Sequence, residues 1–99
     1  MYADDGRSRV FNAVEALAAS AEPIHRRLQT AGVTLLPLQA QDFANPRDGE
    51  LLEEILRALT GVADPTGEHG DIAFTTFSMS DEEAARVAAL IVELLRRLT

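Results

Sequence analysis

The apolar residues of this chain recur every three or four positions over most of its length, which is the spacing of one face of a helix. In the N-terminal part, this stripe consists of Val10, Val14, Leu17 and Ala21. It predicts a helix over about residues 7–20 that ends before Pro23, because a proline disfavours helical backbone in the residue before it. Residues 1–6 are expected to be a frayed tail.

The next apolar stripe consists of Ile24, Leu28, Ala31 and Leu35. Gly32 interrupts it, and a glycine either ends a helix or costs ~1 kcal/mol inside one. If the helix ended there, residues 33–38 would form a strand, but Pro37 disfavours a strand and no partner strand is available. We therefore predict a helix over about residues 22–36. The turn after it is expected to fold two apolar residues under the helices, Leu38 and Phe43.

The clearest helix signals surround residues 46–60. Asn45 is a good capping residue, and Pro46 suits the first turn that follows it. The apolar stripe behind them consists of Leu51, Leu52, Ile55, Leu56 and Leu59. Thr60 and Gly61 then form a typical C-terminal end. We predict a helix over about residues 46–60.

Ser80 opens the last helix, which is predicted over about residues 81–98. Its hydroxyl can accept a hydrogen bond from the amide of Glu83, and the carboxylate of Glu83 can accept one from the amide of Ser80. The preceding segment, residues 71–79, alternates like a strand at some positions and repeats like a short helix at others. Because a lone strand would have no partner in a helical chain, we interpret it as a short helical or irregular element.

These elements predict an all-α fold: a compact bundle of four main helices with one short extra element, in a single domain over residues 1–99. The composition supports this, since alanine and leucine, two of the best helix formers, supply 16 and 13 residues. A chain of 99 residues is also too short for two domains that each bury a core.

The chain is acidic, and the acid is concentrated in its middle. The net charge is −7, whereas residues 42–83 hold eleven acidic residues and two arginines, a net charge of −9. Such a surface repels phosphate backbones and anionic lipid, so we expect no nucleic-acid partner and no membrane partner. The candidate acidic surface consists of Asp48, Glu50, Glu53, Glu54, Glu82 and Glu83. The chain has no cysteine, which fits a cytoplasmic location.

The sequence offers little for catalysis or metal binding. No serine lies in a Gly-x-Ser-x-Gly motif, and His25 is interpreted as a solvated side chain. Residues 63–71 hold four potential metal ligands: Asp64, Glu68, His69 and Asp71. Aligned from Asp64, this loop fails the EF-hand pattern because its twelfth residue is Thr75 rather than glutamate. We therefore expect no enzymatic activity, no catalytic residue, no cofactor and no metal site.

The last helix is apolar over about 220° of its circumference, wider than the ~100° stripe of an ordinary surface helix. Its core-facing residues are expected to be Ala84, Val87, Ile91, Leu95 and Leu98. The remaining apolar residues form two shoulders, Leu90 with Leu94 on one side and Ala85, Ala89 and Val92 on the other. We expect the leucine shoulder to face a second molecule, because it offers the larger apolar area. The candidate interface consists of Leu90, Leu94, Arg97 and Val92. Alternatively, residues 71–79 cover this shoulder and leave a monomer.

These observations favour a small, acidic, non-enzymatic protein-interaction or regulatory module that acts through helix faces, either on another protein or on copies of itself. The alternative is an acidic inhibitor, similar to immunity or antitoxin proteins, that blocks a basic nucleic-acid-binding site on its target. The two differ in the surface that binds, which is the apolar flank of the last helix in the first case and the acidic middle of the chain in the second.

Overall fold

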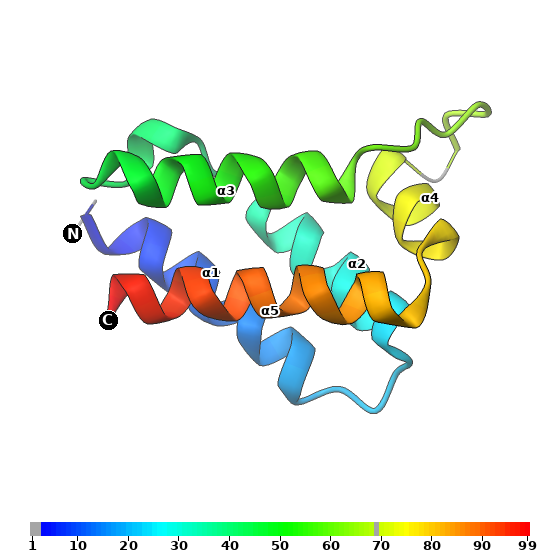
Figure 1. The fold of residues 1–99 in the computed structure, drawn as a ribbon, viewed down its shortest axis with the longest axis horizontal. Helices are drawn as coiled ribbons and strands as arrows, with labels where there is room; N and C mark the ends of the chain where they lie inside the picture. Colours follow the sequence, from blue (N-terminus) through cyan, green and yellow to red (C-terminus); the bar gives the residue numbers. More distant parts are fainter. Residues whose placement is uncertain (1–2, 69) are drawn as a thin grey trace.

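The computed structural model describes residues 3–68 and 70–99, and these form five α-helices and one 3₁₀ turn (Figure 1). In chain order they are α1 (Ala3–Ala18), α2 (Ile24–Leu35), η1 (Ala40–Asp42), α3 (Pro46–Leu59), α4 (Asp71–Ser78) and α5 (Asp81–Leu98). The predicted all-α fold is confirmed. Within the described residues, no helix has the length and hydropathy needed to cross a membrane.

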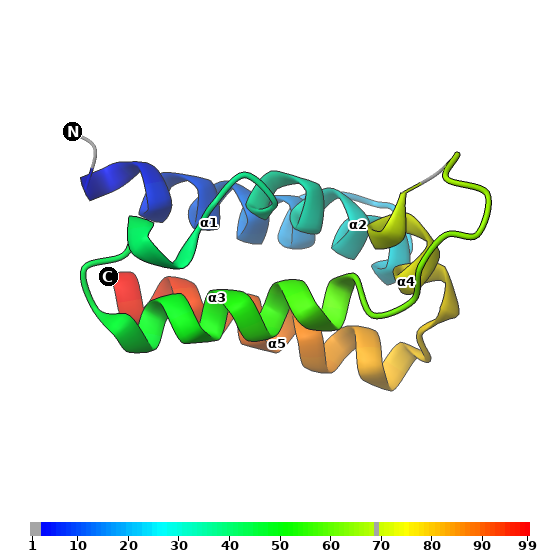
Figure 2. The same cartoon turned by 90° about the horizontal axis from the view of Figure 1, so that it is seen from above.

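The four long helices lie in two layers, with α1 and α2 in one and α3 and α5 in the other (Figure 2). Neighbours within each layer run in opposite directions, and the layers cross obliquely (Figure 1). The core between the layers is filled mainly by aliphatic side chains, the largest of them Leu28, Leu35, Leu52, Ile55, Leu59, Ile91 and Leu94. The short helix α4 closes one end of the bundle, and both chain termini lie at the other end (Figure 1).

The first helix begins earlier than predicted, at Ala3 rather than near residue 7, so residues 3–6 are helical instead of frayed. A tertiary contact accounts for this. Gly6 is buried, and a side chain added there would lie only 3.0 Å from the ring of Phe43, so the first turn packs against the connection between α2 and α3. Residues 1 and 2, the rest of the predicted tail, lie outside the described residues.

Gly32 lies inside α2, as predicted, and a close approach between helices explains why glycine is found there. A Cβ atom at this position would lie 3.1 Å from Leu59 in α3 and 3.1 Å from Ile72 in α4. The missing side chain therefore lets two other helices pack directly onto α2.

The segment before the last helix forms a helix, α4, and it packs mainly against α2 and α3. Thr75 fastens it to the end of α3, because its hydroxyl both accepts a hydrogen bond from the amide of Val62 and donates one to the carbonyl of Val62, each at 2.9 Å. Because α4 is fastened there, the alternative in which it covers a shoulder of α5 is wrong.

The predicted plugs and the cap at Asn45 are confirmed, whereas of the two hydrogen bonds predicted between Ser80 and Glu83 the described residues show the one that the Ser80 hydroxyl accepts. The side chain of Asn45 accepts a hydrogen bond from the amide of Arg47 at 2.9 Å, and the hydroxyl of Ser80 accepts one from the amide of Glu83 at 3.1 Å. Leu38 and Phe43 are both buried beneath the helices. The two caps fix where α3 and α5 begin. Both helices contribute to the surfaces described below.

Candidate interaction surface

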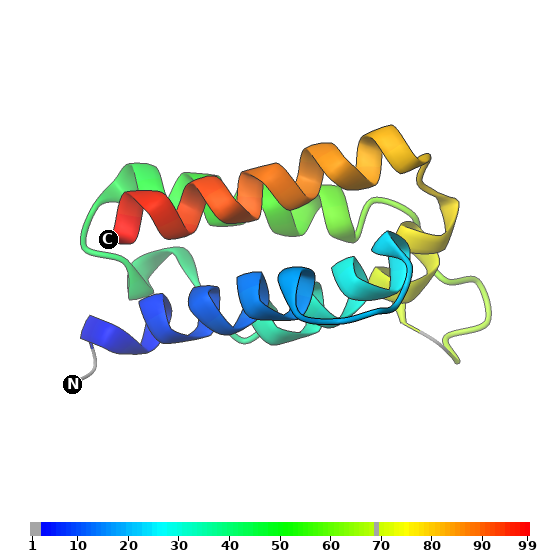
Figure 3. The same ribbon diagram turned by 90° about the horizontal axis from the view of Figure 1, so that it is seen from below.

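A groove of about 510 Å³ runs between α1 and α5 near the chain termini. Its lining residues are Arg7, Ser8 and Phe11 from α1, with Leu95 and Thr99 from α5. Phe11 and Leu95 are its apolar lining residues, and Phe11 is 53% exposed, which is high for a phenylalanine. Figure 3 shows this side of the molecule, where α1 and α5 run side by side in opposite directions.

The apolar surface continues from the groove along α5. At 100° per residue, Val92 and Leu95 lie on the same side of the helix, turned toward α1. Val92 is 40% exposed, and Leu95 is partly buried against the core. We call this surface, formed by Phe11 with Val92 and Leu95, the α1–α5 face.

The prediction that the leucine shoulder binds a second molecule is wrong. Leu94 has no exposed surface and belongs to the core, while Leu90 is partly buried against that core. The reason is the position of α5, which packs against α3 on one flank and α1 on the other, with α2 behind. Two flanking helices cover far more of its wide apolar arc than a single neighbour would. Among the four predicted interface residues, Val92 keeps substantial exposed apolar surface.

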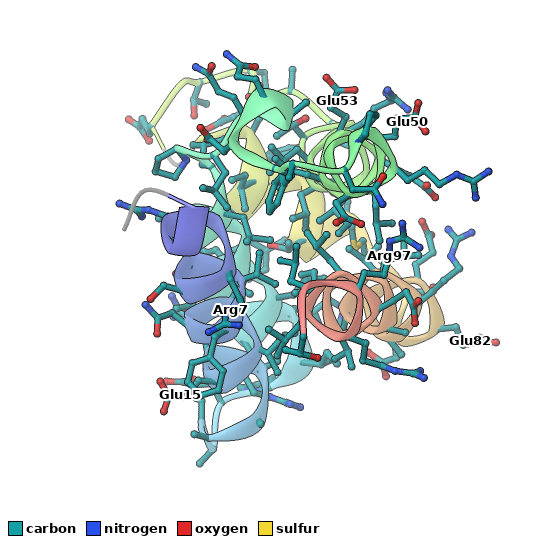
Figure 4. The ribbon with its side chains drawn as sticks, turned by 90° about the vertical axis from the view of Figure 1, so that its left-hand side faces the viewer. Arg7, Glu15, Glu50, Glu53, Glu82 and Arg97 are labelled. Carbon is teal, nitrogen blue, oxygen red and sulfur yellow. The ribbon has the colours of Figure 1, made fainter. Side chains whose placement is uncertain are left out.

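Arg97, another predicted interface residue, lies on the α3 flank and forms an intramolecular ion pair. Its Nε donates a hydrogen bond to Oδ1 of Asp48 at 2.5 Å. Asp48 had been expected on the acidic surface, but its side chain is only 7% exposed. The prediction for Asp48 is therefore wrong, because the side chain of Arg97 reaches this carboxylate in the first turn of α3 from the end of α5. Figure 4 shows Arg97 between the two helices.

This ion pair borders a polar cleft of about 490 Å³ at the end of the bundle. Its charged lining residues are two arginines and two aspartates: Arg7, Arg97, Asp42 and Asp48. Equal numbers of positive and negative side chains favour neither an anion nor a cation. The cleft therefore has no distinct ligand preference on the basis of its charge.

The other predicted acidic residues are exposed, but they do not form a continuous acidic patch. Figure 4 shows Glu50 and Glu53 on the outer side of α3, and Glu82 pointing away from α5. Glu54 and Glu83 are exposed as well. The shallow groove between α3 and α5 combines acidic and basic side chains, with Arg47 and Arg97 beside Glu50, Glu54 and Glu93. Arginines thus break up the negative charge on this side.

The loop between α3 and α4 is organised by Asp64. Its carboxylate accepts hydrogen bonds from the amides of Thr66 and Gly70, at 2.9 and 3.1 Å. Among the residues that the structure describes, no three potential ligands gather into a metal site. His69 lies outside the described residues.

His25 contacts residues that are distant in the sequence. Its Nε2 lies 2.9 Å from the carbonyl oxygen of Met79 and 3.6 Å from a carboxylate oxygen of Asp81. The ring is therefore a link between the start of α2 and the turn that joins α4 to α5. The interpretation as a solvated side chain is wrong, because folding brings that turn, 54 residues away, onto the ring.

Phe11 was not among the residues predicted to lie on an interaction surface. A helical projection would have singled it out, since it lies about 100° from Val10 and so beside the buried stripe rather than within it. No family model, curated protein or solved structure compared with this chain matched it.

Proposed function

We propose that this protein is a non-enzymatic interaction module that binds a helical segment of another polypeptide on the α1–α5 face. The observation that carries the proposal is that the exposed Phe11 lines a groove together with Leu95. Aromatic residues, phenylalanine among them, are enriched in the cores of protein interfaces relative to the rest of the surface. Full burial of an exposed phenylalanine contributes about 1.5–3 kcal/mol, and Phe11, which is 53% exposed, could contribute about half of that to a complex.

The walls of the groove support binding without rearrangement. Phe11 lies on α1 between Val10 and Ala13, and both of these neighbours are completely buried in the core. Leu95 lies on α5, where Ile91, one turn earlier, is also completely buried. Both walls are therefore fixed by the core, and a binding partner would not have to order them. A groove between two antiparallel helices suits an amphipathic helix, which presents apolar residues at every third or fourth position.

The alternative, an acidic inhibitor of a basic site, has less support. Of the predicted acidic residues, Asp48 is buried in its pair with Arg97. The remaining carboxylates on α3 are interspersed with Arg47 and Arg57. An inhibitor that imitates nucleic acid needs a continuous negative surface, and these arginines interrupt it.

The test compares three immobilised proteins in an extract of the source cells: the wild type, Phe11→Ser and Val33→Ser. Val33 is the matched control because it is 56% exposed but lies on α2. We expect the wild type and Val33→Ser to retain a protein that Phe11→Ser does not. That protein, once identified and purified, is then titrated directly against all three variants. Equal binding by Phe11→Ser and the wild type would overturn the proposal.

Salt separates the two candidate functions in the same titration. Binding dominated by apolar contact should change by no more than about threefold between low and high salt, whereas binding steered by carboxylates weakens far more steeply. A loss of about a hundredfold, unaffected by Phe11→Ser, would favour the acidic inhibitor instead.

A further inference from the structure

We propose that the helical segment bound on the α1–α5 face carries a carboxylate side chain one turn from its apolar anchor, and that Arg7 and Ser8 bind this carboxylate. The inference rests on the proposed function, since it uses the same groove, and it states the chemistry of the partner. Three polar groups on α1 support it: the guanidinium of Arg7, the hydroxyl of Ser8 and the carboxylate of Glu15.

Arg7 lines the groove with an exposed side chain, and it forms no ion pair with any residue that the structure describes. It also borders the polar cleft at the end of the bundle, but both carboxylates of that cleft have other partners. Asp48 accepts a hydrogen bond from Arg97. Asp42 accepts one from a backbone amide at 2.8 Å. The positive charge of Arg7 is therefore not compensated by either carboxylate.

Ser8 lines the same groove, and its hydroxyl forms no hydrogen bond with the described part of the chain. Every other serine and threonine hydroxyl in that part donates or accepts one. Thr30, Thr34 and Ser78, for example, each donate to the carbonyl four residues earlier in their own helix. The hydroxyl of Ser8 is thus available to a ligand in the groove.

A guanidinium beside a hydroxyl favours an anionic acceptor. A carboxylate can accept hydrogen bonds from both donors, and hydrogen bonds that involve ionised groups are roughly twice as strong as neutral ones. The other side of the groove adds no competing charge. On α5, Arg96 follows the groove residue Leu95, but Glu93 pairs with it at 3.5 Å. The charge preference of the groove is therefore set by α1.

The spacing along α1 determines where the carboxylate lies on the partner. Arg7 and Phe11 are four residues apart, which is about 6 Å along the helix and about 40° around it. Two residues four apart on a partner helix that lies along α1 have the same separation. When an apolar residue of the partner packs on Phe11, a carboxylate one turn away therefore lies at the level of Arg7.

Glu15 sets the opposite preference on the other side of Phe11. It follows Phe11 by four residues, is exposed, and forms no ion pair with the described residues. Figure 4 shows Arg7 and Glu15 extending from α1. Successive turns of α1 thus present a guanidinium, a phenyl ring and a carboxylate. The complementary helix presents a carboxylate, an apolar side chain and a cation in the same order, because like charges facing each other weaken binding.

The first experiment selects binders from a displayed peptide library, since it needs no identified partner. The library is an amphipathic helical scaffold of about five turns. The residues one turn before and one turn after its central apolar residue are varied among glutamate, lysine and glutamine. The immobilised targets are the wild type, Phe11→Ser, Arg7→Glu and Arg47→Glu. Arg47 is the matched control because it is exposed, lies on α3 and forms no ion pair with the described residues. Circular dichroism confirms that all variants keep the wild-type helix content.

We expect the clones that bind the wild type but not Phe11→Ser to carry opposite charges at the two varied positions. They should outnumber clones with two lysines by about tenfold. Arg7→Glu presents two carboxylates, so clones with two lysines should prevail there. Arg47→Glu should give the wild-type result. The same preference on Arg7→Glu as on the wild type would overturn the proposal.

The second experiment titrates one selected peptide by fluorescence anisotropy. We expect Arg7→Gln to raise the dissociation constant about fivefold and Ser8→Ala about threefold. Both effects should disappear when the glutamate of the peptide is replaced by alanine, because the partner of the two side chains is then absent. Wild-type affinity in both variants, or losses that persist with the alanine peptide, would show that these residues bind no carboxylate.

Failure of this inference is distinguishable from failure of the proposed function. Clones that depend on Phe11 but show no charge preference would overturn the carboxylate contact and leave the α1–α5 face as an interaction surface. If no helical peptide bound in a way that depended on Phe11, both proposals would fail.

Discussion

Arg97 in the last turn of α5 donates a hydrogen bond to Asp48 in the first turn of α3, and this pair joins two helix ends that lie 49 residues apart in the chain. The arrangement suits both helices electrostatically. A carboxylate stabilises the N-terminal end of a helix and a guanidinium the C-terminal end, because each opposes the partial charge of the helix dipole there. One contact thus complements two dipoles at the end of the bundle where both chain termini lie.

Removing the arginine should destabilise the protein more than removing the aspartate. We expect Arg97→Met to lower the free energy of unfolding by about 2–3 kcal/mol, since it leaves a carboxylate that is 7% exposed without its partner. Asp48→Asn should cost about 1 kcal/mol, because the Arg97 side chain is 32% exposed and can be hydrated. Urea denaturation measures both, with the exposed Arg86→Met as the control. Equal losses in the two variants would contradict this account.

Gly49 should not tolerate even an alanine. A Cβ atom there would lie 2.8 Å from the carbonyl oxygen of Ala40 in η1, and this backbone atom cannot move aside without shifting the turn. We expect Gly49→Ala to lower the free energy of unfolding by about 2 kcal/mol, although alanine is the better helix former. Gly61→Ala, whose Cβ would have 3.5 Å to its nearest neighbour, should change it by less than about 0.5 kcal/mol. Similar values for the two variants, from thermal unfolding, would refute the proposed clash.

The hydroxyl of Thr75 should matter more than that of its neighbour Thr76, although both residues are buried. Thr75→Val removes two hydrogen bonds to the backbone of Val62, and we expect a loss of about 1–2 kcal/mol. Thr76 donates one hydrogen bond to the carbonyl of Ala73 within its own helix, so Thr76→Val should cost less than about 0.5 kcal/mol. Hydrogen exchange provides a second readout, since Thr75→Val alone should expose the amide of Val62.

The cap of α5 should contribute a measurable part of its stability. We expect Ser80→Ala to lower the free energy of unfolding by about 1 kcal/mol, because the amide of Glu83 loses its acceptor in the first turn. Ser78→Ala is the control, since the hydroxyl of Ser78 donates to the carbonyl of Phe74 within α4 and caps no amide. A loss in the control equal to that in Ser80→Ala would show that the cap contributes nothing specific.

The positions of the helices could be predicted because the signals that set them are local. The caps at Asn45 and Ser80 act on amides two and three residues away, and both form as expected. The apolar spacing likewise identified most of the buried face of each helix, including the continuation of α2 through Gly32. Such signals depend on chain neighbours and on the geometry of a helix, and both are contained in the sequence.

The edges of the buried faces could not be predicted in the same way. Leu94 is predicted to be on the surface and is buried, whereas the groove beside Phe11 exists only because folding brings α5 next to α1. Whether a residue at the edge of an apolar stripe is covered depends on how many helices flank it and how close they come. For α5 that number is set by the packing of α1 and α3 on its two sides.

The sequence by itself therefore determined the four main helices to within a few residues and most of the stripe that each turns inward, because period, propensity and caps act within a few residues. Tertiary structure alone decided that Asp48 pairs with Arg97, that His25 reaches Met79, and that α1 and α5 leave a groove between them. Each of these depends on residues 49 or more positions apart, or on two helix edges that meet only after the layers pack. The free energy of such contacts is gained only on folding, so no local pattern in the chain records it.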